Sequence, residues 1–518
     1  MNINIHIDSK QAGRPLDHFW SRCVGAGRAH EGLRANWQEQ LALVAKQCGF
    51  KSVRFHGLFH DEMFVCRERD GELFYNWQYI DELFDRMLGL GVRPFVELGF
   101  MPEALTENDW RCFWWKGGAT PPADMNKWTA LVDAFVRHCI DRYGFDEVAG
   151  WRFEVWNEPN LPYFWQCEGD RERRYFDLYA ATARTVKAID PALKVGGPAT
   201  SNFHTDQLDH VPDETELRSL VWKAVWIESF LSYCTKHRVP VDFISAHPYP
   251  SDFPLDDVVK PGRPRLRRSV RSTAEDLATL RAHIDASAFD RLEIHCTEWN
   301  SSPSSRDHVH DELPAAAFII SAIACAINAA DSLAYWTFTD CFEEAGAGDR
   351  AFHGGFGLIN FQGVAKPAFH AYRFLHRLGD ELLSHDVDHI VSRRADGRIS
   401  AVLCNYADDR MAPVDCKQRE QIAALRAACD PAQARLTLTN LPPCARFDWE
   451  QVDDEHGCAV TRWKAMDMPQ SPSPEQLAAL RAATADTRIE QLQADDDGVL
   501  KIEREVPPWA VVCLTQRA

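Results

Sequence analysis

The feature that most limits what this chain can fold into is a regular alternation of β-rich runs and amphipathic helical stretches between residues 19 and 378. We count eight such pairs, an order typical of βαβ units that form a parallel sheet. This spacing predicts an α/β fold, the (β/α)8 TIM barrel, whose active sites form at the carboxyl ends of the strands. The predicted strands are Phe19–Ala29, Lys51–Gly57, Arg93–Gly99, Gly150–Asn157, Lys194–Ala199, Asp242–Pro248, Arg291–Asn300 and Ser332–Thr339.

Helical patterns follow the strands, and one of them needs separate treatment because it is uncharged. Residues Leu313–Ala330 just reach the length of a membrane-spanning helix. The segment is rich in alanine and occupies a helix position in the repeating pattern, so we predict a buried barrel helix and no membrane span. Other predicted helices are Trp37–Cys48, Asn126–Tyr143, Thr215–Lys236 and Phe369–Leu378.

The pattern changes after Gly379, where period-two runs separated by turns replace the alternation. A chain of 518 residues also exceeds the usual size of one domain. We therefore predict a catalytic barrel over residues 14–378 and an accessory β-sandwich formed by residues 1–13 plus 379–518. Its predicted strands include Ile399–Cys404, Arg435–Leu441 and Trp509–Thr515, with one helix at Pro474–Ala483.

The composition narrows the possible partners. A formal net charge of -19 opposes nucleic-acid binding, which requires a basic face to neutralise phosphates. Hydrophobic residues at 45% and charged residues at 26% indicate an ordinary globular protein. The sixteen cysteines form no C-x-x-C pair, and the first residues lack the pattern of a secretory signal. We expect reduced thiols and a cytoplasmic location.

Two predicted strands end in a glutamate. Residues 151–160 begin as a buried strand and stop at Pro159, which leaves Glu158 at the carboxyl end, and the seventh strand carries Glu298 in the same position. Two strand-end carboxylates facing one pocket match what glycoside cleavage requires: one donates a proton to the leaving oxygen, and the other attacks the anomeric carbon or activates water. Glu97 and Glu154 precede the rim and are interpreted as buried structural acids.

These motifs identify a family resemblance. Three blocks resemble those of glycoside hydrolase family 39 in their order and spacing: SVRFHGLFHD at residues 52–61, WNEPN at 156–160 and TEWN at 297–300. This family includes bacterial β-xylosidases and α-L-iduronidases. The resemblance spans both predicted domains. It implies a retaining exo-hydrolase that works through a covalent glycosyl-enzyme, with Glu158 as general acid/base and Glu298 as nucleophile.

The resemblance also implies roles for side chains beside the two glutamates. It makes Asn157 the partner of the sugar 2-hydroxyl, a contact that strengthens in the transition state. Tyr249 is expected to hydrogen-bond the nucleophile, with His247 supporting it. Taken alone, a histidine or tyrosine on a barrel strand is more often a core residue than a ligand of the substrate.

The remaining implied pocket residues come from other strand ends and loops. His56 is expected to hold the outer hydroxyls, and Trp336 to form the floor of the pocket. Glu343 and Glu344 are expected to bind the 3- and 4-hydroxyls, and Phe164 matches the family's pocket wall.

Competing signals are weak. Gly25 and Gly27 lack the third glycine of a dinucleotide-binding motif, so we interpret them as a tight turn. His56 and His60 stand four residues apart, but His56 lies on a strand end and no third metal ligand accompanies them. No metal and no organic cofactor is implied.

Three functions are compatible with these residues. The first is a β-xylosidase that releases xylose from small xylo-oligosaccharides, as in xylan degradation. The second is an α-L-iduronidase-like hydrolase; iduronate carries a carboxylate, and Lys116, which matches the family's pocket wall, is the candidate cation. The third is an inactive carbohydrate-binding barrel, which the presence of both acids opposes.

Overall fold

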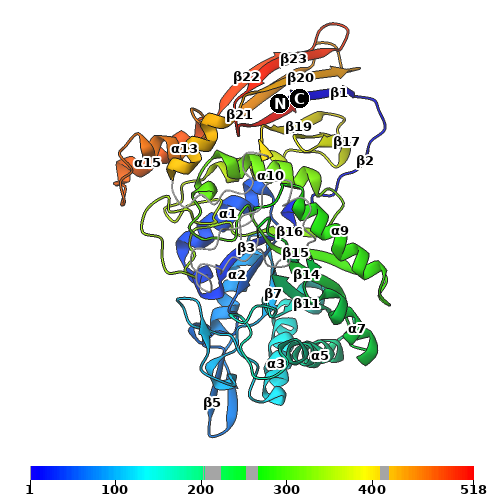
Figure 1. Cartoon of the computed structure of the whole chain (residues 1–518), viewed down its shortest axis with the longest axis vertical. Helices are drawn as coiled ribbons and strands as arrows, with labels where there is room; N and C mark the ends of the chain where they lie inside the picture. Colours follow the sequence, from blue (N-terminus) through cyan, green and yellow to red (C-terminus); the bar gives the residue numbers. More distant parts are fainter. Residues whose placement is uncertain (1, 202, 205–222, 252–266, 409–418) are drawn as a thin grey trace.

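The computed structural model describes residues 2–201, 203–204, 223–251, 267–408 and 419–518. Eight parallel strands close into a barrel that forms the lower part of the molecule in Figure 1, which confirms the predicted fold class. The barrel strands, in chain order and in order around the barrel, are β3 (Val24–Arg28), β4 (Ser52–His56), β7 (Arg93–Leu98), β10 (Arg152–Val155), β11 (Lys194–Ser201), β14 (Phe243–His247), β15 (Glu293–Trp299) and β16 (Ser332–Tyr335).

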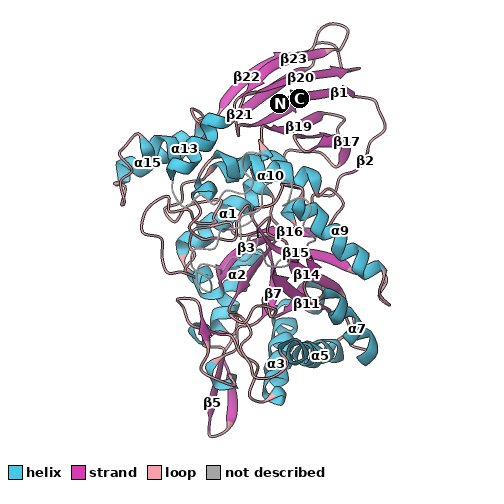
Figure 2. Ribbon diagram, in the orientation of Figure 1, coloured by secondary structure: helices cyan, strands magenta, loops and turns pink. Residues whose placement is uncertain are grey.

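A helix follows each barrel strand, and these helices surround the barrel (Figure 2). Local sequence sets their ends: the Asp124 side chain accepts a hydrogen bond from the Asn126 backbone at the start of α3, and Gly49 adopts φ +78° after α1. Of the predicted helix 215–236, residues 215–222 lie outside the described residues. The helices are α1 (Ala35–Cys48), α2 (Gln78–Gly89), α3 (Met125–Tyr143), α5 (Arg171–Ile189), α7 (Ile227–His237), α9 (Ser272–Asp285), α10 (Leu313–Cys325) and α11 (Pro367–Leu375).

The first predicted strand and the predicted glycine turn require correction. Residues Phe19–Ser21 form a short 3-10 helix, η1, and only Val24–Arg28 joins the barrel. Gly25 and Gly27 therefore lie within a strand. At Gly25 an added Cβ would come within 2.4 Å of Cε3 of Trp336, so the glycine is needed because that ring packs directly on the backbone.

The barrel interior is layered. Cys23, Phe95, Phe243 and Ala334 form an apolar cluster. Along β4, side chains alternate between the two faces, so Val53 and Phe55 join the core with the helices, whereas Arg54 contacts acids from other strands across the barrel.

The second domain consists of two sheets that share an apolar core, as expected for a β-sandwich, and it contains both chain termini (Figure 1). β1 pairs in parallel with β20, and β2 pairs with β17. The domain boundaries, residues 14–378 for the barrel and residues 1–13 plus 379–518 for the sandwich, stay a prediction. One sheet has the order β2 (Arg14–Pro15), β17 (Glu381–Asp386), β18 (His389–Arg393), β19 (Ile399–Cys404), β24 (Val511–Gln516), β21 (Arg446–Val452) and β22 (Arg488–Gln493), and the other β1 (Asn2–Asp8), β20 (Ala432–Thr439) and β23 (Leu500–Val506).

Helices also belong to the second domain. The predicted helix at 474–483 is α15 (Pro474–Ala485), which begins with a capping box between Ser473 and Gln476, and two further helices were not predicted. The domains are held together by ion pairs such as Arg373 Nη2 to Glu450 Oε1 at 2.7 Å. The further helices are α13 (Arg419–Ala428) and α14 (Ala459–Lys464).

The uncharged segment forms α10, which is buried along almost its entire length, as predicted. Within the described part of the chain, no helix is long and apolar enough to cross a membrane. Short elements in the loops are η2 (Ala29–Leu33), η3 (Asp61–Met63), η4 (Glu103–Leu105), η5 (His308–Asp311), α4 (Phe145–Val148), β5 (Cys66–Arg69), β6 (Glu72–Tyr75), β8 (Arg111–Cys112), β9 (Gly117–Gly118), β12 (Phe203–His204) and β13 (Lys223–Ala224).

Candidate active site

Glu158 lies three residues beyond the end of β10, in a segment with unusual backbone geometry. Trp156 and Glu158 have φ of +75° and +43°, a region that residues other than glycine rarely adopt. The segment is held because the Glu158 N–H donates to Ala199 O at 2.9 Å and the Asn160 side chain exchanges two hydrogen bonds with the Ser201 backbone. Neighbouring strand β11 therefore sets the direction of the Glu158 side chain.

Glu298 lies inside β15 rather than after it. The pairing of β15 with β16 shifts register between Cys296 and Trp299, as at a β-bulge. In a regular strand Thr297 and Glu298 would face opposite sides, but here both are buried and both contact residues inside the barrel. The irregularity therefore directs Glu298 into the site.

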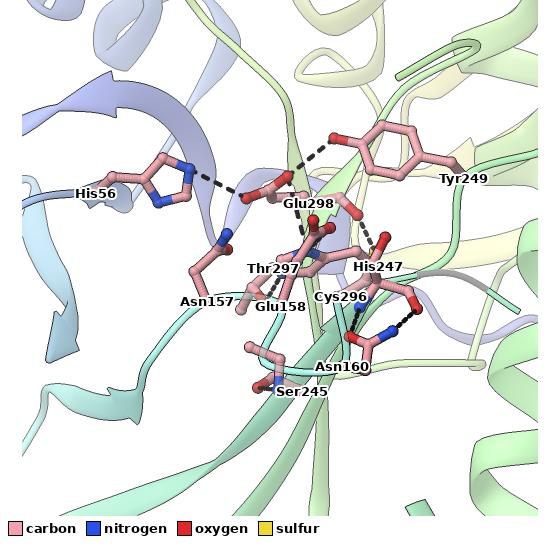
Figure 3. A network of polar contacts seen from close by, with 12 residues as sticks. His56, Asn157, Glu158, Asn160, Ser245, His247, Tyr249, Cys296, Thr297 and Glu298 are labelled. Atoms are coloured by element: carbon pink, nitrogen blue, oxygen red, sulfur yellow. Dashed lines mark hydrogen bonds and ion pairs between the residues drawn. The ribbon is translucent and has the colours of Figure 1, made fainter. Parts of the chain in front are cut away.

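The side chains of the two glutamates lie close together (Figure 3), and both line a small cavity. One carboxylate oxygen of Glu158 and one of Glu298 lie within 4.8 Å of each other, with a ring nitrogen of His247 equally close. The cavity has a volume of about 50 Å³. It is lined by His56, Phe113, Asn157, Glu158, Phe164, Tyr249, Glu298, Pro303, Trp336, Glu344 and Phe356.

Two predicted pocket residues lie elsewhere. Lys116 is exposed in the loop after β8 and does not line the cavity. Glu343 is paired with Arg34 at 2.7 Å and Arg28 at 2.9 Å, so two guanidinium groups already hold its carboxylate outside the cavity. Its neighbour Glu344 does line the cavity, 3.5 Å from His56 Nε2.

His247 also differs from its predicted role. We expected it to support Glu298, but its Nδ1 lies 2.8 Å from Glu158 Oε1 and 3.7 Å from Glu298 Oε2. The ring is fully buried and does not line the cavity, so contact with a substrate is excluded by position. Tyr249 is placed as predicted, donating to Glu298 Oε2 at 3.1 Å.

Arg54 organises the site, and sequence reasoning missed it. This fully buried guanidinium donates to Glu154 at 2.7 Å, Glu298 at 2.6 Å and Asn157 at 2.8 Å, and it pairs with Glu97 at 2.7 Å. Glu97 and Glu154 are thus buried structural acids, as interpreted. The signal was available, since an arginine in a buried strand needs acidic partners and two strand acids nearby had none assigned.

Burial and neighbouring charges give Glu298 and Glu158 different pKa values. Burial raises the pKa of Glu298 to about 7, against the lowering effect of the Arg54 and His56 charges. Burial and the nearby charge of Glu298 raise the pKa of Glu158 well above its usual value. Glu298 therefore ionises first, and Glu158 retains its proton.

The two histidines carry different charges. Although burial opposes it, the carboxylates of Glu97 and Glu344 raise the pKa of His56 to about 10, so the ring is an imidazolium. Burial, reinforced by the charges of Arg54 and His56, holds the pKa of His247 well below its usual value, so that ring is neutral.

A parallel barrel with two carboxylates that project from its fourth and seventh strands into one small cavity defines the enzyme class of glycoside hydrolases. Comparison with known proteins gives the family: the model of glycosyl hydrolases family 39 matches residues 3–498. The chain belongs to this family, as the sequence motifs indicated.

Relatives with curated functions and relatives with solved structures are consistent with this family. A β-xylosidase of Geobacillus stearothermophilus is 39% identical over 488 residues, covering 93% of this chain and 89% of the relative. Human α-L-iduronidase is 31% identical over 212 residues, 39% of this chain and 30% of the relative. The crystal structure of a monomeric β-xylosidase from Caulobacter crescentus CB15 superposes with a TM-score of 0.86 and 32% identity, covering 99% of each chain.

Proposed function

We propose that this protein is a retaining, exo-acting β-xylosidase that releases xylose from small xylo-oligosaccharides through a covalent glycosyl-enzyme. The observation that carries the proposal is the spacing of the acids. One carboxylate oxygen of each acid lies within 4.8 Å of the other, which suits the roughly 5–5.5 Å between carboxyl groups in retaining enzymes better than the roughly 6.5–9.5 Å in inverting ones.

Each acid is suited to one role. Glu298 accepts hydrogen bonds from Arg54 and Tyr249, which favours the ionised nucleophile. Glu158 retains a proton to give to the leaving oxygen while Glu298 attacks the anomeric carbon. In the second step Glu158 takes a proton from water, which displaces Glu298 and releases the sugar.

The cavity walls offer the contacts that a pentose needs. Asn157 Oδ1 is occupied by Arg54, which leaves its amide N–H groups to donate to the sugar 2-hydroxyl. Trp336 presents an aromatic face, and His56 with Glu344 supplies a donor and an acceptor for the outer hydroxyls. An exo-acting enzyme of this design takes one terminal sugar into the cavity.

Xylose is favoured over iduronate by charge and by similarity. Among the described residues that line the cavity, His56 is the single basic side chain, and Glu97 and Glu344 already balance it. Lys116, the cation that an iduronate carboxylate would need, does not line it. The β-xylosidase relative matches 93% of this chain, compared with 39% for the iduronidase.

Time-resolved NMR of the first sugar released tests the proposal. Hydrolysis of an aryl β-xyloside is expected to give β-xylose first, because two displacements retain the configuration, whereas early α-xylose contradicts a covalent intermediate. An iduronide assayed in parallel is expected to give no product. Absence of turnover on both substrates supports the binding-protein alternative.

A further inference from the structure

A series of hydrogen bonds that ends at Glu158 indicates where the proton of this acid lies, because each group in the series has a fixed number of protons to donate. The series runs from Glu154 through Thr297 and His247 to Glu158, joining β10, β15 and β14; the last three residues are seen in Figure 3. Once the donor is known at the Glu154 end of the series, the donor at the Glu158 end follows.

At the first end, Glu154 Oε2 accepts a hydrogen bond from Arg54 Nε at 2.7 Å in a fully buried ion pair. The Thr297 hydroxyl lies 2.8 Å from the other oxygen, Oε1. An ionised carboxylate only accepts, so the single hydroxyl proton of Thr297 points to Glu154. Thr297 therefore offers His247 only oxygen lone pairs.

The next link is His247 Nε2, which lies 3.1 Å from Thr297 Oγ1. Since that oxygen only accepts there, the proton of the neutral ring is on Nε2 and Nδ1 carries a lone pair. Nδ1 faces Glu158 Oε1 at 2.8 Å. Two lone pairs at this distance repel, so the proton between them belongs to Glu158.

We infer that Thr297 is a positioning residue for acid catalysis: it fixes His247 as the Nε2–H tautomer, so that a bare Nδ1 faces Glu158 and keeps the catalytic proton on that acid. The inference rests on the proposed function and adds a residue that touches no substrate. Thr297 is fully buried and does not line the cavity.

The groups around Glu158 act in both directions. Burial and the charge of Glu298 raise the pKa of Glu158, whereas the Ser201 side chain and the charges of His56 and Arg54, both from β4, lower it. Tyr249 also faces this acid. Glu298 is met by donors, from Arg54 and Tyr249, whereas His247 presents Glu158 with an acceptor. The same cavity thus favours the ionised form of one acid and the protonated form of the other.

The arrangement acts in both steps of the reaction. In the first, the Glu158 proton leaves its hydrogen bond to His247 Nδ1 and joins the glycosidic oxygen as the Glu158 O–H bond breaks. The C1–O bond breaks as Glu298 bonds to C1, and the leaving sugar departs as an alcohol. The Glu158 carboxylate then faces the lone pair of Nδ1, which destabilises its charge. That carboxylate is a stronger base for taking a proton from water when the glycosyl-enzyme is hydrolysed.

Thr297→Val tests the inference, with Thr297→Ser as the matched control that restores the hydroxyl. Without the hydroxyl, Nε2–H loses its acceptor and His247 is free to donate from Nδ1 to the Glu158 carboxylate. We expect the alkaline limb of kcat/KM on xylobiose to move to lower pH by about one unit or more, with the acid limb in place. Thr297→Ser is expected to keep the wild-type limb.

A second measurement uses the wild-type enzyme and needs no activity. In protein labelled with ¹⁵N-histidine, the ring shifts of His247, assigned by their loss in His247→Gln, are expected to report the neutral Nε2–H tautomer. An Nδ1–H tautomer, an imidazolium at neutral pH, or an unmoved alkaline limb in Thr297→Val overturns the inference. Failure of the wild type to hydrolyse β-xylosides, with Nε2–H observed, instead overturns the proposed function alone.

Discussion

The centre of the barrel and the core of the sandwich bury different kinds of side chain. In the sandwich, β1 and β20 alternate strictly, and the inward residues are aliphatic, such as Ile5 and Leu436. In the barrel, the inward residues include Arg54, Glu97 and Glu154, all fully buried. Burying charge is costly even when it is paired, whereas burying aliphatic surface stabilises.

The two regions therefore have separate tasks. The barrel centre accepts the cost of buried charge because Arg54 must hold Glu298 and Asn157 in place. None of the described residues of the sandwich lines the cavity, and this domain contributes packing. Changes in the barrel centre should therefore act mainly on turnover, and changes in the sandwich core mainly on stability.

The largest expected effect is that of Glu298→Ala. Without the carboxylate no glycosyl-enzyme forms, so kcat is expected to fall by at least about 10⁴-fold on ordinary and activated xylosides alike. Circular dichroism should remain that of the wild type, because Arg54 keeps Glu97 and Glu154 as partners. Substantial turnover on an activated xyloside would remove Glu298 from the nucleophile role.

Glu158→Gln should have the next largest effect, and it should depend on the leaving group. Removing the acid is expected to lower kcat/KM on xylobiose by roughly 10²–10⁴-fold. The loss should be much smaller for an aryl group that leaves without a proton. Equal losses on the two substrates would argue against Glu158 as the proton donor.

Leu436→Ala tests the other side of the comparison. This side chain is 1% exposed in the central strand of its sheet, so truncation is expected to lower the free energy of unfolding by about 2–5 kcal/mol. kcat measured well below the unfolding temperature should stay at the wild-type value. Arg435→Ala, on the outward face of the same strand, is the control and should cost less than about 1 kcal/mol.

The pH dependence of activity reports the protonation states of the two acids at the barrel centre. The active form has Glu298 ionised and Glu158 protonated, so activity is expected to fall below the pKa of Glu298 and above that of Glu158, by about tenfold per pH unit on each limb. Since burial raises both pKa values, the acid limb should lie above the usual 4.5 of a glutamate. In Glu158→Gln the alkaline limb should disappear; its persistence would assign that limb to another group.

The smallest effect is expected at Lys116. Because the side chain is exposed and outside the cavity, Lys116→Ala should change kcat/KM on xylobiose by less than about twofold. A loss of tenfold or more would place this lysine at the substrate and reopen the case for an acidic sugar.

Most of the architecture could be predicted from local sequence. Strand and helix periodicity identified the barrel strands to within a few residues except for the first, which begins five residues later than predicted, and the end of a strand at Pro159 placed Glu158 at the carboxyl rim. The sandwich strand predicted at Ile399–Cys404 has those bounds in the structure. Such features depend on neighbours in the chain, which a single sequence contains.

Which polar groups meet depends on the tertiary structure. Arg54 and Glu298 are 244 residues apart, and His247 and Glu158 are 89 residues apart. Their contacts depend on the register of eight strands, on the irregularity in β15 and on a loop held to β11. The same long-range geometry turns Glu343 to Arg34 while Glu344 lines the cavity. The sequence determined which acids are available, and the barrel's closure determined their partners and, through those partners, which of them holds a proton.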